Sequence, residues 1–283
     1  MHFKLRDHMS HRGEGTINED QAGVNDHLAW IIDGATDLNP VAYFPGSTDA
    51  RWVVDQVNTK LYEVSADSTP YLSKEIYQQL ARHVRHELTK VDYPPDRILP
   101  SCSCGIARLD PDCEGVQLSL VGDVYLFAVS TNTLLSNAYF SGREAAGVQR
   151  ARSRLGTSKQ AVSPAYDRHE IARRRQQYIV GIDGNVVLSA NEEALETGVQ
   201  EQRTSARLGD LFLLCTDGFA RLIHPYGIYR SWPELASEIV AHGLDVALKK
   251  LRHHEVQHLS PYDSYKTSDD ACAMLISIEE NAT

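Results

Sequence analysis

Several features that would place a protein in a special class are missing from this sequence of 283 residues. No apolar run approaches the roughly 18 residues that cross a membrane. The first fifteen residues, MHFKLRDHMSHRGEG, lack the apolar core of a secretory signal. No linker rich in Pro, Gly or Ser, no repeat and no low-complexity run divides the chain. We therefore expect one domain over residues 1–283, without a membrane partner.

The sequence also has few cysteines and fewer basic than acidic residues. The five cysteines are an odd number and contain no C-x-x-C pair, which favours buried free thiols in a reducing compartment over a disulfide framework. We therefore expect a cytoplasmic location. The formal net charge of −10 argues against a nucleic-acid partner, because neutralising phosphates requires a basic face.

One segment reverses the acidic balance. Between Arg143 and Arg175 the chain has eight arginines and one lysine but only three acidic residues. The segment fits an arginine-rich insertion at about residues 141–180. Two interpretations stay open: a solvated surface insertion, or a cover that attracts an anionic substrate.

Hydrophobic periodicity predicts strands and helices in blocks rather than in strict alternation. Short apolar or alternating runs predict strands at residues 21–24 and 28–32 and in CSCGIARLD, GVQLSLVGD, VYLFAVS, NVVLSA, DLFLLCTDG and ACAMLISI. Spacing of three to four residues predicts helices beginning at Ser47 or Thr48, and at about 69–91, 232–241 and 244–258. Such blocks favour an α+β fold with helices packed on largely antiparallel sheets.

Acidic residues gather at the ends of these predicted strands. They are Glu19 and Asp20 before the first strand, Asp33 after LAWII, Asp123 after LSLVG, Asp217 after LFLLCT, and Asp269 and Asp270 before ACAMLISI. Any one of them alone is typical of a turn or a helix cap. Together they would converge on one sheet edge, where so much buried like charge requires cations. Carboxylates of this kind are the usual ligands of Mg²⁺ and Mn²⁺.

The motifs NEDQAG, WIIDGATD, SLVGDVYLF, LLCTDGFARL and SDDACAMLI occur in this order over residues 13–278. The ordered set resembles the metal-dependent protein phosphatases of the 2C type, in a divergent and bacterial-type form. The resemblance implies a four-layer α-β-β-α sandwich with two central, largely antiparallel sheets. It also implies hydrolysis of phosphoserine or phosphothreonine by a water that two Mn²⁺ or Mg²⁺ ions activate.

The resemblance carries the family's metal-site roles onto particular residues of this chain. Asp33 would bridge both metals, and the Gly34 carbonyl would bind one of them. Asp217 and Asp269 would complete the first metal's ligands, and Glu19 and Asp20 would serve the second. Asp123 would support a third, weaker metal. Asp33, Asp217 and Asp269 are thus the expected catalytic carboxylates.

The sequence departs from the family pattern at three places. Gly15 stands where the family has an arginine that binds substrate phosphate, and Arg12 is the nearest upstream candidate for that role. The loop after Asp33 reads DGATD. Arg221 stands where the family has a third-metal acid, and it could bind substrate phosphate instead. Pairing of Arg221 with a local carboxylate is the open alternative.

Three other functions remain as alternatives. A catalytically weak binding module is one, because the expected phosphate-binding arginine is missing. A phosphatase of small phosphorylated metabolites is another. The third is a zinc metalloprotease, because residues His254 to His258 match the H-E-x-x-H pattern. No G-x-x-H follows that pattern, and polar residues near a helix C-terminus explain it equally well.

Overall fold

A computed structural model provides the structure. It describes the backbone of residues 1–66, 72–112, 114–140, 164–258 and 268–281. Side chains are described over the same ranges, except at 164–170 and 258. The start of the helix expected near residue 69, Cys113, and most of the insertion with Arg143, Arg152 and Arg154 lie outside the described residues.

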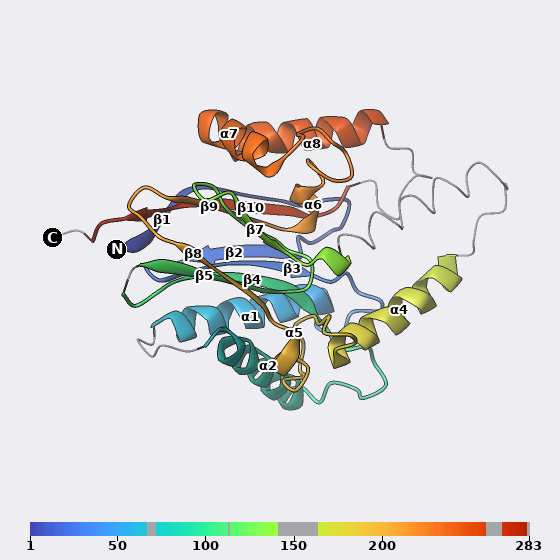
Figure 1. The fold of residues 1–283 in the computed structure, drawn as a ribbon. Coiled ribbons are helices and arrows are strands. Elements are labelled where there is room, and N and C mark those ends of the chain that lie inside the picture. The colour runs from blue at the N-terminus through green and yellow to red at the C-terminus, as the bar shows by residue number, and fades with distance from the viewer. Residues whose placement is uncertain (67–71, 113, 141–163, 259–267, 282–283) are drawn as a thin grey trace.

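Two antiparallel sheets of five strands each stack at the centre of the described chain (Figure 1). The upper sheet in Figure 1 has the order β1 (His2–His11), β10 (Ala271–Glu279), β9 (Leu211–Cys215), β6 (Tyr125–Ala128) and β7 (Thr133–Ser136). The lower sheet has the order β2 (Asp20–Val24), β3 (Leu28–Gly34), β4 (Cys102–Leu109), β5 (Gly115–Val121) and β8 (Gln200–Ser205).

Helices cover the outer face of each sheet (Figure 1). The lower sheet is covered by α1 (Asp49–Ala66) and α2 (Ser73–Lys90), and the upper sheet by α7 (Trp232–His242) and α8 (Leu244–His258). Shorter elements are α5 (Leu195–Gly198) and α6 (Asp217–Ala220), while α4 (Pro164–Val180) lies at one end of the sheets. The four-layer α-β-β-α architecture predicted from the sequence is confirmed.

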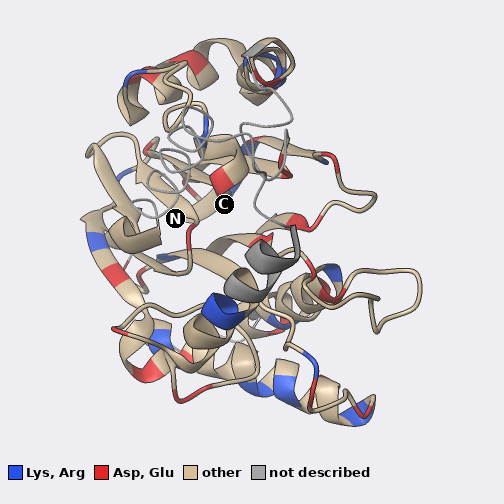
Figure 2. Cartoon of the chain, turned by 90° about the vertical axis from the view of Figure 1, so that its right-hand side faces the viewer, with Lys and Arg blue, Asp and Glu red and all other residues tan. Residues whose placement is uncertain are grey.

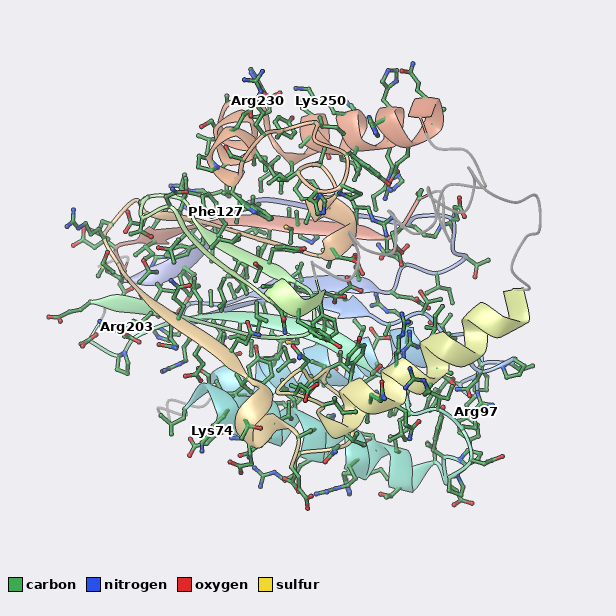
Figure 3. The ribbon with its side chains drawn as sticks, turned by 45° about the vertical axis from the view of Figure 1, so that its right-hand side comes forward. Lys74, Arg97, Phe127, Arg203, Arg230 and Lys250 are labelled. Atoms are coloured by element: carbon green, nitrogen blue, oxygen red, sulfur yellow. The ribbon has the colours of Figure 1, made fainter. Side chains whose placement is uncertain are left out.

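Amphipathic patterns in the sequence explain why these layers form. The apolar residues spaced along α1, such as Val53, Val57 and Leu61, are fully buried against the lower sheet. Phe127 on β6 points into the upper helix layer, where its ring lies 5.9 Å from that of Trp232 (Figure 3). Apart from these two contacts between helices and sheets, a separate apolar cluster fills the space between the two sheets. Burial on both faces makes the sheets a rigid support for residues at their edges.

The strands and helices agree with the sequence predictions except at a few places. NVVLSA is not a strand, since it contains only two isolated bridges, from Asn185 to Ile182 and from Leu188 to Cys102. No pattern in the sequence predicted β1, β7 or β8. Most β1 side chains are at least partly exposed, so β1 lacks the apolar run that marks the inner strands. Four cysteines, 102, 104, 215 and 272, are buried and free as expected.

None of the helices in the described part of the chain is both long and apolar enough to span a bilayer.

Candidate metal centre

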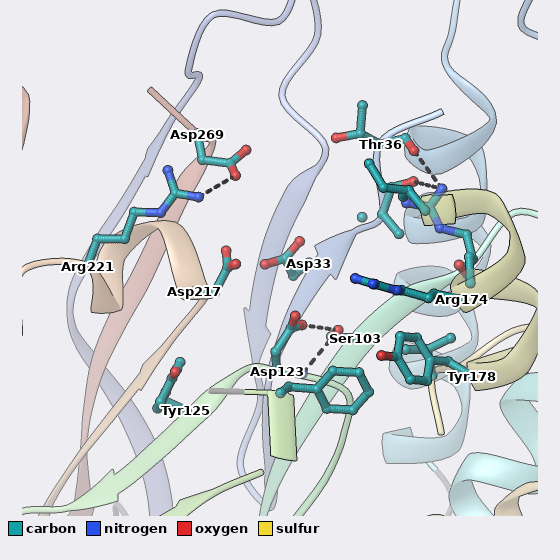
Figure 4. Close-up of a pocket in the computed structure, with 17 residues that line it drawn as sticks. Asp33, Thr36, Ser103, Asp123, Tyr125, Arg174, Tyr178, Asp217, Arg221 and Asp269 are labelled. Atoms are coloured by element: carbon teal, nitrogen blue, oxygen red, sulfur yellow. Dashed lines mark hydrogen bonds and ion pairs between the residues drawn. The ribbon is translucent and has the colours of Figure 1, made fainter. Parts of the chain in front are cut away.

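Strand register places two carboxylates and a hydroxyl in one row across the lower sheet. Asp20 on β2 pairs with Asp33 on β3, and Asp33 pairs with Ser103 on β4. Directly paired residues of antiparallel strands project to the same face. The hydroxyl of Ser103 donates to the carboxylate of Asp123 (Figure 4). The lower sheet therefore delivers Asp20, Asp33 and Asp123 to one area.

The upper sheet delivers the other predicted carboxylates to the same place. Asp217 opens α6 directly after β9, and Asp269 precedes β10. Both line a pocket of about 410 Å³ together with Asp33 and Asp123 (Figure 4). Carboxylates that are far apart in sequence thus meet where the two sheets end.

Hydrogen bonds hold the two halves of the centre together. The hydroxyl of Thr216, after β9, donates to Asp20 on β2 at 2.8 Å. The carboxylate of Asp270 accepts hydrogen bonds from the backbone N–H groups of Gly13 and Glu19 at 2.7 and 2.6 Å. Glu19 and Asp20 are 7% and 3% exposed. Asp270 is therefore a structural support of the segment that carries both acidic residues.

Glycine follows Asp33 and Asp217 because the backbone has no room for a larger residue. A Cβ atom on Gly34 would lie 2.6 Å from the carbonyl oxygen of Glu19. One on Gly218 would lie 1.9 Å from the carbonyl oxygen of Asp270. The two D-G pairs thus mark points where chain segments touch next to the acidic residues.

Burial and mutual repulsion disfavour the ionised form of the carboxylates that the lower sheet carries. Burial is the main cause that raises the pKa of Asp20 and of Asp33 well above the ordinary value of 3.8, and neighbouring aspartates raise both further. The hydrogen bond from Thr216 partly offsets this rise at Asp20. Burial also raises the pKa of Asp123, against the hydrogen bond from Ser103. A cation would relieve this unfavourable energy.

The donor set fits hard divalent cations. The converging groups are carboxylate and hydroxyl oxygens, which Mg²⁺ and Mn²⁺ prefer. Within the described residues, however, no three His, Cys, Asp or Glu side chains are already gathered closely enough to hold one ion. One reason is visible in Figure 4, where Asp269 turns toward Arg221, which donates to it at 2.9 Å. Another is the repulsion among the carboxylates themselves.

Of the two residues predicted to bind phosphate, Arg221 lines the pocket and Arg12 does not. Gly15 and Arg12 are exposed, and neither lines the pocket. The guanidinium of Arg12 donates to the carbonyl of Thr16 in its own loop at 2.9 Å. Arg221 does line the pocket, but it pairs with Asp269. The structure thus shows the carboxylate pairing that the sequence left open for Arg221.

Two further arginines that the sequence analysis did not single out reach the pocket from α4. Arg174 and Arg175 both line it. Arg175 donates to the carbonyl oxygens of Ala35 and Thr36 at 3.2 and 2.6 Å. The arginine-rich composition of the insertion was the available signal, but composition does not tell which arginine faces the site.

Asp37, in the DGATD loop, has a structural role. Its carboxylate accepts hydrogen bonds from the backbone N–H groups of Asp49 and Ala50 at 2.8 and 3.0 Å. These are N–H groups of the first turn of α1, which have no partner within the helix. Asp37 therefore fixes the loop after Asp33 to the start of α1.

The H-E-x-x-H segment lies away from the pocket. The ring of His254 stacks on that of Tyr226, with centroids 4.8 Å apart. Glu255 is 2% exposed and pairs with Arg252 at 2.8 Å. His254 does not line the pocket, and the described residues include no metal-holding group that contains it. The side chain of His258 lies outside the described part of the chain. A packing role explains His254 and Glu255.

Comparisons with known proteins show relatives by structure. No protein-family model and no curated protein matches the sequence. The catalytic domain of the serine/threonine phosphatase PstP, solved with two manganese ions, has 15% identity and a TM-score of 0.57, with 99% of each chain covered. The Mycobacterium tuberculosis phosphatase PstP/Ppp has 14% identity and a TM-score of 0.56, covering 99% of this chain and all of that one.

A third similar structure is the phosphatase Stp1 from Staphylococcus aureus. It has 15% identity and a TM-score of 0.55, and the match covers 98% of this chain and 96% of that chain. The fold of this chain is therefore that of the bacterial serine/threonine phosphatases of the 2C type, as the sequence resemblance implied.

Proposed function

We propose that the protein is a metal-dependent phosphomonoester hydrolase that acts on phosphoserine or phosphothreonine in proteins. The observation that carries this proposal is the convergence of Asp33, Asp217 and Asp269 from both sheets at one pocket. Asp20 does not line the pocket, but it lies directly opposite Asp33 and is hydrogen-bonded to Thr216, which follows β9 of the upper sheet. The fold of known serine/threonine phosphatases supports it. The whole chain, 1–283, would act as one catalytic domain.

The carboxylates would hold two divalent cations, Mn²⁺ or Mg²⁺. Asp33 would lie between the two ions, with the Gly34 carbonyl on one of them. Asp217 and Asp269 would bind the first ion, Glu19 and Asp20 the second, and Asp123 a weaker third. Such ions, when bound, lower the pKa of water and neutralise charge on the phosphoryl group.

The chain's own residues prepare this centre. Thr216 orients the Asp20 carboxylate, and Ser103 orients that of Asp123. Arg221 holds Asp269 at the edge of the pocket, and a direct contact of Arg221 with substrate phosphate stays a prediction. Asp37 and Arg175 fix the loop after Asp33. The bonds from Thr216 and Ser103 preorganise Asp20 and Asp123 before a substrate arrives.

The test is turnover of p-nitrophenyl phosphate and of a phosphothreonine peptide with Mn²⁺ or Mg²⁺. We expect activity that rises through neutral to mildly alkaline pH and disappears on chelation. Full activity in excess EDTA, after dialysis to remove tightly held metal, would contradict the proposal. A strong preference for small phosphorylated metabolites over the peptide would contradict the protein substrate alone.

A further inference from the structure

A cationic side chain in the pocket would favour the binding of substrate phosphate. A phosphomonoester brings up to two negative charges into a site that is already rich in carboxylates. The family position for a phosphate-binding arginine is Gly15 here, and neither Gly15 nor Arg12 lines the pocket. The described lining has three arginines, at positions 174, 175 and 221.

Two of these three guanidinium groups bond to segments that carry expected metal ligands. Arg221 donates to Asp269 at 2.9 Å, with 14% of its side chain exposed. Arg175 donates to two backbone carbonyls in the loop after Asp33, the shorter bond being 2.6 Å. Withdrawing either one would release a segment that carries an expected metal ligand. Their contacts suit positioning better than substrate binding.

Arg174 is placed differently. Adjacent residues of a helix point about 100° apart, so Arg174 does not follow Arg175 toward the loop carbonyls. Its side chain extends from α4 into the pocket toward Asp33 and Asp123 (Figure 4). It faces the centre from the wall opposite Arg221. Figure 2 shows the basic part of α4 beside acidic segments of the sheet ends.

We propose that Arg174 binds the phosphate of the substrate from α4, in place of the arginine that the chain lacks at position 15, while Arg175 acts as a positioning residue. This inference rests on the proposed function. A guanidinium suits the role because its planar fork donates two parallel hydrogen bonds to phosphate oxygens.

The neighbouring arginine on α4 provides a matched control. Arg173 is exposed and does not line this pocket. Arg174→Ala and Arg173→Ala remove the same charge from consecutive positions of one helix. A general electrostatic effect of the insertion would change both variants equally, whereas a direct phosphate contact would change only the first.

The experiment measures kcat/KM for p-nitrophenyl phosphate at saturating Mn²⁺, and binding of inorganic phosphate and of Mn²⁺ by calorimetry. Arg174→Ala should lower kcat/KM and phosphate affinity by roughly ten- to a hundredfold, with Mn²⁺ affinity unchanged. Arg174→Lys should recover part of both, because a point charge makes one contact in place of two. Arg173→Ala should match the wild type.

Equal values for Arg174→Ala and Arg173→Ala would overturn the assignment of Arg174 while leaving the phosphatase proposal intact. Loss of Mn²⁺ binding or of thermal stability in Arg174→Ala, without recovery in Arg174→Lys, would show a structural role and also overturn it. A wild-type protein that binds phosphate but never turns over substrate would refute the enzymatic proposal alone. In that case, selective loss of phosphate binding in Arg174→Ala would still support this inference.

Discussion

In the lower sheet, Asp20 and Asp33 lie opposite each other across β2 and β3. Burial raises the pKa of both carboxyls, and neighbouring aspartates raise it further, Asp20 among them for Asp33. In the upper sheet, Asp269 pairs with Arg221, and Arg252 donates to the Asp269 carbonyl at 2.8 Å. One half of the centre thus gathers like charges, and the other half already contains cations. Metal ions bound as proposed would therefore stabilise chiefly the lower half, whereas arginines already pair with Asp269 in the upper half.

The comparison predicts that both halves are indispensable for catalysis. Asp33→Ala, in the lower sheet, and Asp217→Ala, in the upper half, should each lower kcat by roughly a thousandfold or more, because each removes a carboxylate that balances the metal charge. Turnover of p-nitrophenyl phosphate at saturating Mn²⁺ measures the effect.

His254→Ala provides the control for these two variants, because His254 packs on Tyr226 outside the pocket. Its activity should stay close to that of the wild type. If the histidine variant lost activity and the aspartate variants kept it, the zinc interpretation of the H-E-x-x-H segment would replace the present one.

The stability of the fold should depend on Arg252, which bonds to the segment just before β10. Arg252→Ala would leave Glu255, which is 2% exposed, without its ion-pair partner, and would free the backbone around Ser268 and Asp269. Removing one partner of a buried pair costs about 3 kcal/mol in the free energy of unfolding. Urea denaturation measures this loss.

The exposed Arg230, on the same side of the molecule (Figure 3), is the control for that measurement. Arg230→Ala should change the unfolding free energy by less than about 0.5 kcal/mol. Similar losses in both variants would show that Arg252 has no special role in holding the Asp269 segment.

The raised pKa values in the lower half predict that the folding stability of the metal-free protein depends on pH. Folding raises the pKa of Asp20 and Asp33 above 3.8, so the folded state binds more protons than the unfolded state above that pH. Stability should therefore fall as pH rises from about 4 toward the raised folded values. Thermal unfolding in EDTA, from pH 5 to 8, measures this slope.

Adding Mn²⁺ should remove most of this slope, because the ions stabilise the ionised carboxylates. Asp33→Asn should also flatten it in EDTA, since the amide does not titrate. A metal-free protein whose stability rises steadily over the same pH range would contradict the idea that burial and repulsion disfavour the ionised carboxylates of the lower half.

The smallest expected effect concerns the cation of the upper half. Arg221→Ala frees the Asp269 carboxylate and removes a positive charge beside the metal site, so Mn²⁺ should bind roughly three- to tenfold more tightly, a gain of about 1 kcal/mol. Calorimetric titration measures it. An unchanged Mn²⁺ affinity, together with a ten- to hundredfold loss in kcat/KM, would instead identify Arg221 as a phosphate ligand.

Much of the fold was predictable because the signals are local. Alternating or continuous apolar runs marked seven strands of the sheets correctly, and the spacing along α1 marked its buried face. NVVLSA failed because an apolar run of six residues fits an isolated bridge as well as a strand. The mostly exposed edge strand β1 has no strong pattern of its own. Its position comes from pairing with β10, more than 250 residues away.

The acidic residues at the strand ends and the glycines beside them follow from local sequence, because strand periodicity, turn chemistry and the need for a small residue act over a few positions. The partners of these residues depend instead on how the folded chain is packed. The pairing of Arg221 with Asp269, the bond from Thr216 to Asp20 and the approach of Arg174 join residues 48, 196 and more than 50 positions apart. Such contacts depend on sheet register and layer packing, which no local pattern of residues specifies.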